Sequence, residues 1–310
     1  MQPQAPRATD SGGIKSGPGC PFRLAAGFTG RGRLASAGEQ GLKALFRMIH
    51  YSYILLEPLT SFESTAEIRR TFDLVKDCGY EGVELQVTRP LGCEVETLLR
   101  WITEAGLTVP SFLTGEAYHK GLCLSSPDKR VRQRTVDRLC EYVDIASAFD
   151  AILVVGLLQG LRSDEPDPQT ANQRISDCLR DVAEAAHSQG VDLVLEPINH
   201  LQVGFNHTVA EVLQLVQEVD SPALLPMVDT VHMNIEEHNL LQPIRDCGQQ
   251  LRHVHLCESN GREFGTGHIN FSAVLETLDE IGYDRFASVK IYRGTDLEAN
   301  ARTSLTWLKR

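Results

Sequence analysis

The chain has 310 residues, of which 42% are hydrophobic, and its formal net charge is −11 at pH 7. One large core is possible at this length, since a single (β/α)₈ barrel needs about 250 residues. The acidic charge and the lack of a Lys/Arg stripe argue against nucleic acid as a partner. No apolar run approaches the ~20 residues of a membrane span. None of the eight cysteines sits in a CxxC pair, so we expect reduced thiols in a cytoplasmic protein.

Residues 1–43 differ in composition from the rest of the chain. They are rich in Gly, Pro, Ala, Ser and Arg, and their only acidic residues are Asp10 and Glu39. Such a stretch cannot bury enough apolar surface to order itself. We therefore expect a disordered or artefactual extension over 1–43 and one catalytic domain over 44–310, with Met48 as a second candidate start.

Short apolar runs alternate with helical patterns over the rest of the chain. We expect strands over 48–56, 82–87, 108–113, 151–157, 192–197, 224–231, 252–257 and 286–291. We expect helices over 65–78, 94–105, 128–148, 170–188, 208–219, 240–248, 271–281 and 297–308. This order predicts an α/β fold, a single (β/α)₈ TIM barrel, with an open doubly wound sheet as the alternative. No GxGxxG string follows the first strand, which weakens a dinucleotide-binding interpretation.

Four successive strands lead to residues that can bind a metal or move a proton: Glu196, Asp229, His255 and Lys290. In a closed barrel the carboxyl ends of the strands face one pocket. His253 lies two residues before His255, so both rings should point to the same side of their strand. Two carboxylates and one imidazole suit Mn²⁺, Co²⁺ or Mg²⁺. The sequence therefore predicts a metal site at Glu196, Asp229 and His255. The structural alternatives are a buried Glu196 paired with an arginine, and Asp229 as a helix cap.

Several strings resemble the sugar isomerase/epimerase superfamily of xylose-isomerase-like TIM barrels. They are LEPIN, DTVHMNIEE, HVHLCESNGREFGTGHINF and GYDRFASVKIY, and the likeness covers most of residues 50–308. The chain looks most like ketose 3-epimerases of the D-tagatose and D-psicose type and related keto-sugar-acid epimerases. The resemblance implies a small-molecule sugar as substrate and a homo-oligomer, a dimer or tetramer.

The resemblance also implies one divalent metal held by Glu, Asp, His and a second Glu. The first three match Glu196, Asp229 and His255, whereas the second Glu falls on Lys290. A substrate-contacting His matches His232, which we expect on the loop after its strand.

Other pocket positions depart from the family pattern as well. A position that is Glu in the family is Gln202 here, and the Arg that ends the family's EPLNR string is replaced by His200. The Arg of the family's SNR motif is displaced in this chain to Arg262. We expect His232, Glu116, Gln202 and Arg262 to bind substrate. Further candidates near the pocket, each with a structural role as the alternative, are Glu84, Gln86, Glu258 and His268.

The implied reaction is epimerisation through an enediolate, in which two groups on opposite faces of the sugar exchange protons with it. Here the two catalytic groups would be Glu196 and Lys290. Lys290 is a base only when neutral, and we expect burial beside a metal to lower its pKa. A cationic Lys290 paired with Glu196 in place of the metal, and a Schiff base at Lys290, remain open. The predicted function is a divalent-metal-dependent ketose or keto-sugar epimerase. The alternatives are Schiff-base lyase chemistry, a non-catalytic carbohydrate-binding relative and an endonuclease.

Removing the first 44 residues tests the composition argument. A chain that begins at Leu45 should fold and melt at the same temperature as the full chain, because the removed stretch lacks a packable apolar pattern. Limited proteolysis with mass spectrometry, followed by thermal melts of both proteins, measures this. Failure of the shortened chain to fold would contradict it.

Overall fold

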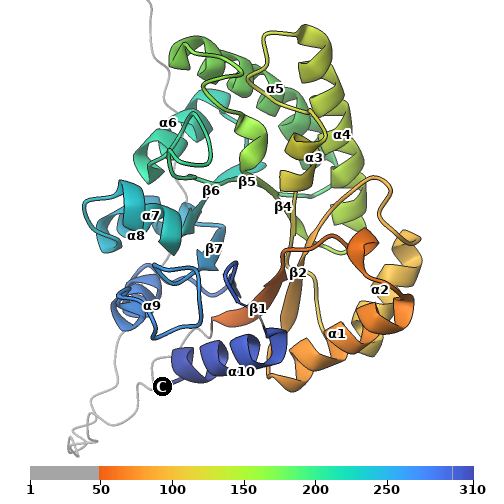
Figure 1. Ribbon diagram of the computed structural model, residues 1–310. Coiled ribbons are helices and arrows are strands. Elements are labelled where there is room, and N and C mark those ends of the chain that lie inside the picture. The colour runs from red at the N-terminus through yellow and green to blue at the C-terminus, as the bar shows by residue number, and fades with distance from the viewer. Residues whose placement is uncertain (1–48, 295) are drawn as a thin grey trace, which may run out of the picture. The chain divides into compact units, whose positions relative to one another are not determined.

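The computed structural model describes residues 49–294 and 296–310. In this part of the chain eight parallel strands close into a barrel in the order β1 to β8, and β8 pairs back with β1. Helices surround the strands (Figure 1). The predicted single (β/α)₈ barrel is confirmed, and the open doubly wound sheet is excluded. The extension predicted over 1–43 and the second start at Met48 lie outside the described residues.

Every predicted strand is present, in a shortened form. The strands are β1 His50–Leu55, β2 Gly82–Gln86, β3 Ser111–Leu113, β4 Ile152–Val155, β5 Leu193–Leu195, β6 Leu224–Asp229, β7 His253–Leu256 and β8 Phe286–Val289. The largest loss at a strand's start is in β3, which was expected from residue 108. Pro110 precedes its first residue and has no N–H group to donate to a neighbouring strand.

The helices follow the predicted pattern with two additions. They are α1 Thr65–Asp77, α2 Val95–Glu104, α3 Gly115–His119, α4 Lys129–Ala148, α5 Pro168–Ser188, α6 Val209–Val219, α7 Thr230–Glu236, α8 Leu241–Cys247, α9 Phe271–Glu280 and α10 Leu297–Leu308. Neither α3 nor α7 is among the predicted helices. Both are short, and they begin beside the ends of β3 and β6, where we expected outgoing loops.

Capping residues fix the helix ends. Ser64 accepts a hydrogen bond of 3.2 Å from the N–H of Glu67 and so begins α1. Gly79, with φ of +97°, follows the end of α1. Since glycine has no Cβ, it adopts this left-handed conformation without steric cost.

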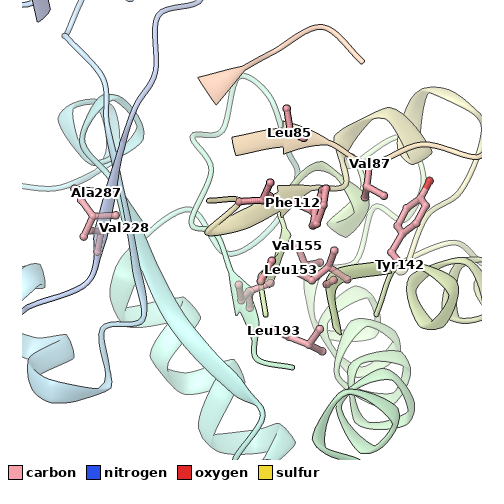
Figure 2. Packing of buried hydrophobic residues seen from close by; sticks show 14 of the residues in the cluster. Leu85, Val87, Phe112, Tyr142, Leu153, Val155, Leu193, Val228 and Ala287 are labelled. Carbon is pink, nitrogen blue, oxygen red and sulfur yellow. The ribbon is translucent and has the colours of Figure 1, made fainter. Parts of the chain in front are cut away.

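Strand side chains alternate between the surrounding helices and the barrel interior. Leu153 and Val155 of β4 belong to the large outer core that also contains Tyr142 of α4 (Figure 2). Ile152 and Val154 of the same strand belong to a separate, smaller cluster. That cluster draws one or two residues from each of several strands and fills part of the interior: Ile54, Leu113, Ile152, Val154, Val194 and Met227.

The rest of the interior is polar, which is unusual for a barrel packed mainly with branched apolar side chains. Its buried members come from β1, β2, β3, β7 and β8: Ser52, Glu84, Ser111, His253 and Ser288. Hydrogen bonds join them, with 2.7 Å between the hydroxyls of Ser52 and Ser288 and 3.1 Å from Ser288 Oγ to His253 Nε2. Buried polar groups need such partners. These hydrogen bonds therefore hold the polar side chains of the interior in place below the carboxyl ends of the strands.

None of the helices in the described ranges combines the length and the apolar character needed to cross a membrane. The seven cysteines within those ranges are free thiols.

Candidate functional site

The four predicted residues meet at the carboxyl ends of β5 to β8. Asp229 and His255 are fully buried, and Glu196 is 5% exposed. The backbone continues the strand pairing at the two positions that follow a strand. Glu196 N–H donates to the carbonyl of Val155 at 2.9 Å, and Lys290 N–H donates to the carbonyl of Leu256 at 2.8 Å. The barrel backbone therefore fixes where these side chains start.

Two carboxylates converge on one ammonium group. The Nζ atom of Lys290 lies 2.7 Å from Oδ2 of Asp229 and 3.6 Å from Oε1 of Glu196. The same two oxygens lie 3.5 Å and 3.2 Å from Nδ1 of His255. Glu196 is thus paired with Lys290 and His255, and the alternative of a buried Glu196 paired with an arginine is wrong.

These contacts set the charge of Lys290. Burial acts to lower its pKa, but the carboxylates of Asp229 and Glu196 outweigh burial and raise the pKa above its ordinary value. Burial likewise acts to raise the pKa of Asp229, but Lys290, together with His232 and His255, more than reverses this effect, so that the pKa lies well below the ordinary value. Lys290 is therefore an ammonium ion. The expectation of a lowered pKa is wrong, because two anions beside the amine outweigh its desolvation.

His232 faces the same carboxylates from the first turn of α7. The helix begins directly after β6 because Asp229 caps it, with Oδ1 accepting from the N–H of Val231 at 2.9 Å. The predicted cap role of Asp229 is thus real alongside its contact with Lys290. His232 is buried, and burial is the main cause that lowers its pKa. The side-chain amide of Asn199 lies 2.7 Å from its Nδ1 and orients the ring.

Glu84 lies deeper in the barrel and holds both histidines of β7. Its Oε1 is 3.0 Å from Nε2 of His255, and its Oε2 is 3.1 Å from Nε2 of His253. The two rings therefore point to one side of β7, as expected. Burial acts to lower the pKa of His255, but Glu84, Asp229 and Glu196 raise it well above its ordinary value. Glu84 is fully buried, and its contacts are to these rings, so its role is to orient His255 from below.

A cavity of about 260 Å³ opens above the cluster. Among the sequence candidates, Glu196, His232, Gln202, Gln86 and Lys290 line it. The other lining residues are Leu56, Leu113, Thr114, Gly115, Val154, Gly156, Leu157, Ile198, Val231 and Tyr292. A Cβ on Gly156 would lie 2.5 Å from Oε2 of Glu196. The glycine at the end of β4 therefore makes room for that carboxylate.

Glu116, Arg262 and Glu258 do not line the cavity; α3 contributes Gly115 to its wall instead of Glu116. The backbone N–H of Arg262 bonds the side chain of Asn260, and Arg262 itself is exposed. Glu258 shapes the loop that follows β7: its Oε1 accepts from the N–H of Ser259 at 2.8 Å and of Ile269 at 3.2 Å.

His268 and His200 also have partners away from the cavity. His268 Nε2 lies 3.1 Å from Oδ1 of Asn234. His200 Nδ1 lies 2.6 Å from Oε1 of Glu236. Asn199 and the cavity-lining Thr114 are site residues that were not predicted from the sequence. A polar residue shortly after a strand end was the available signal for both.

The sequence profile described as xylose isomerase-like TIM barrel matches residues 72–310. The chain belongs to this family. Among curated members, L-ribulose 3-epimerase of Mesorhizobium japonicum is 30% identical over 224 residues, which cover 70% of this chain and 73% of that protein. The 3-dehydro-D-guloside 4-epimerase of Escherichia coli is 27% identical over 254 residues, which cover 78% and 94%. A solved structure of L-ribulose 3-epimerase aligns with a TM-score of 0.75 at 26% identity, over 84% of this chain and 94% of that one. The resemblance seen in the sequence is thus confirmed.

Within the described part of this xylose isomerase-like barrel, two groups of side chains are candidate divalent-metal sites: Glu84, His253 and His255, and Glu196, Asp229 and His232. The donor types suit such an ion, but Lys290 shares the oxygens of the second group. At about 4 Å and an effective dielectric of about 20, each pair of unit charges contributes about 4 kcal/mol, and a divalent ion doubles it. With Lys290 in this position, the residues do not fit a bound divalent ion.

Removing the carboxylate of Glu84 should destabilise the fold. Glu84→Ala leaves His255 with its Nε2 buried and without its anion, so we expect a loss of about 3–5 kcal/mol in the free energy of unfolding. Urea denaturation followed by circular dichroism measures it. The matched control is Glu104→Ala, which removes an exposed pair with Arg69 and should cost less than about 1 kcal/mol. Equal losses in the two variants would contradict the role of Glu84.

Glu84 also predicts how stability depends on pH. Burial acts to raise its pKa, but His255 and His253 lower it well below the ordinary value of 4.5. A carboxyl group of this kind stabilises the fold above its unfolded pKa, and the contribution is lost as the pH falls through the folded pKa. Below about pH 4.5 the wild type should therefore lose stability more steeply than Glu84→Gln. Parallel slopes in urea melts at stepped pH would argue against this.

Proposed function

We propose that the chain is a sugar epimerase that moves a proton on the carbon atom next to the carbonyl group of a ketose or keto-sugar derivative. The observation that carries the proposal is the contact of a buried carboxylate, Glu196, with an ammonium group, Lys290, in the wall of the cavity. The named relatives, L-ribulose 3-epimerase and 3-dehydro-D-guloside 4-epimerase, support the substrate class.

Glu196 is the base in this proposal. The C–H group beside a carbonyl becomes acidic when the carbonyl oxygen receives positive charge or a strong hydrogen bond. The ammonium of Lys290 lines the same cavity and donates to that oxygen as negative charge develops on it. The electron pair left by the C–H bond is then held as an enediolate between the two groups.

The returning proton comes from the ammonium of Lys290 on the opposite face, which inverts the carbon centre. This leaves a protonated Glu196 and a neutral amine. Because Oε1 of Glu196 and Nζ of Lys290 are 3.6 Å apart, the sugar must enter between them for the two groups to flank its reacting carbon. When the sugar leaves, a proton shift from the carboxyl group to the amine restores both groups. The cycle neither gains nor loses protons overall.

The cavity wall supports an uncharged sugar as substrate. Oε1 of Gln86 is buried without a hydrogen-bond partner among the described residues, and Gln86 lines the cavity. Together with Gln202, Thr114 and His232 it offers acceptors and donors to several hydroxyl groups. Of the described residues in the cavity wall, Lys290 is the only Lys or Arg. A phosphate group would find no second cation there, so we favour a free sugar or sugar derivative.

A divalent ion is the polarising group that the sequence predicted. The donor types of Glu196, Asp229 and His255 suit Mn²⁺, Co²⁺ or Mg²⁺, but the position of Lys290 among them does not. When bound, such an ion polarises a carbonyl as a Lewis acid. The ammonium of Lys290, 2.7 Å from Asp229, opposes it.

The predictions of Schiff-base chemistry, cellular location and oligomeric state rest on different observations. Schiff-base chemistry is disfavoured, because a nucleophilic amine must be neutral and Lys290 is an ammonium ion facing two carboxylates. The predicted reducing, cytoplasmic location rests on the spacing of the cysteines in the sequence alone. The predicted homo-oligomer rests on the resemblance alone.

Glu196→Gln should abolish turnover, because an amide cannot accept the proton. We expect a loss of about 10²–10⁴-fold or more. Epimerisation of L-ribulose, D-psicose and a 3-keto-glycoside, and deuterium uptake from D₂O at the reacting carbon, are the measurements. Glu104→Gln, an exposed exchange, is the matched control and should keep wild-type rates.

Three results would count against the proposal. Full turnover by the Glu196→Gln variant would remove that residue from the chemistry. Borohydride trapping of a sugar on Lys290 of the wild type would favour the Schiff base. Tight sugar binding without any deuterium uptake would favour a non-catalytic carbohydrate-binding protein.

A further inference from the structure

In the cluster at the ends of β5, β6 and β8, one ammonium group lies between two carboxylates. Asp229 is fully buried and Glu196 nearly so, and each directs one carboxylate oxygen toward the same ammonium group. The side chain of Lys290 is itself only 16% exposed. Leaving two carboxylates this deep without a cation would be costly, since a buried charge needs a partner.

Nearby nitrogen atoms complete an arrangement like the ligand shell of an ion. Nδ1 of His255 lies 3.2 Å and 3.5 Å from the two carboxylate oxygens, and Nε2 of His232 lies 3.8 Å and 3.7 Å from them. All of these donors face a shared space, and Nζ of Lys290 is the group in closest contact with Asp229 there.

We propose that Lys290 is the built-in cation of this site, which takes the place of a divalent ion between Glu196 and Asp229. It follows that the wild-type chain does not retain such an ion. Removal of this one ammonium group should turn the same donors into a metal site. The inference concerns ion binding and does not depend on the proposed epimerase activity.

Lys290 can be substituted without loss of the backbone hydrogen bond that holds this position. Its backbone N–H donates to the carbonyl of Leu256, and this bond is independent of the side chain. Lys290→Met keeps a long unbranched side chain and removes the charge. Lys290→Glu goes further, because it adds a third carboxylate that only a cation can offset.

The experiment measures Mn²⁺ binding to the full chain after dialysis against EDTA and then against metal-free buffer. Electron paramagnetic resonance of free Mn²⁺ gives the affinity, and thermal melts with and without Mn²⁺ give a second readout. We expect weak binding with little change in melting temperature for the wild type. Lys290→Met should bind at least ~100-fold more tightly, and Lys290→Glu more tightly still.

Two controls separate the site from general effects. Lys76→Met removes a lysine whose Nζ donates to the backbone carbonyl of Gly106 on the surface, and it should behave as the wild type. Asp229→Asn combined with Lys290→Met should lose the gained affinity, because one donor is removed. If Lys290→Glu does not fold without metal, folding on addition of Mn²⁺ supports the inference, and Lys290→Met still tests it.

Stoichiometric Mn²⁺ retained by the wild type after dialysis would overturn the inference. So would equal affinities of the wild type and the Lys290→Met variant, since the ammonium would then not compete for the site.

Discussion

The contact between Asp229 and Lys290 is the interaction on which the rest of the site depends. It joins the end of β6 to the residue that follows β8, with β7 between them, so it ties together three neighbouring strands of the closed barrel. Its ammonium group helps to hold the pKa values of Glu196 and Asp229 below their ordinary values. Had this ammonium been absent, two buried carboxylates would face each other with only imidazole groups between them, and their pKa values would rise.

The deeper polar layer explains why this cluster can exist inside a barrel. Glu84 turns His255 so that Nδ1 faces the upper carboxylates, and it bonds His253 with its other oxygen. Ser111 and Ser288 then contact His253 at 3.2 Å and 3.1 Å. The buried charge of Glu84 is thus surrounded by hydrogen-bonded polar groups instead of apolar side chains, which lowers the cost of burying it.

Much of this arrangement could be predicted from the sequence, because it depends on periodicity. The alternation of strands and helices gave the barrel, and the ends of apolar runs placed Glu196, Asp229, His255 and Lys290 together. The spacing of His253 and His255 put both rings on one face. These inferences need only the period of a strand and the position of chemistry in a closed barrel.

Features of the site that depend on distances between strands could not be predicted from the sequence. The sign of the pKa shift of Lys290 follows from two carboxylates within 4 Å, and no local pattern reports that. Glu84 was placed within its strand, and of its two proposed roles the structural one applies, since its carboxylate contacts His253 and His255. Arg262 belongs to a loop whose path is set by hydrogen bonds to Glu258, and family spacing could not locate its side chain.

Asp229 uses its two oxygens in opposite directions, and this limits what can replace it. Oδ1 accepts from the backbone N–H of Val231 at 2.9 Å, while Oδ2 accepts from the ammonium of Lys290 at 2.7 Å. An asparagine has one acceptor oxygen and one donor NH₂ group. In either orientation of the amide, a donor would meet a donor, at the start of α7 or at Lys290. The carboxylate is therefore rotationally locked, and Asn, the nearest match in shape, is not its chemical equivalent at this position.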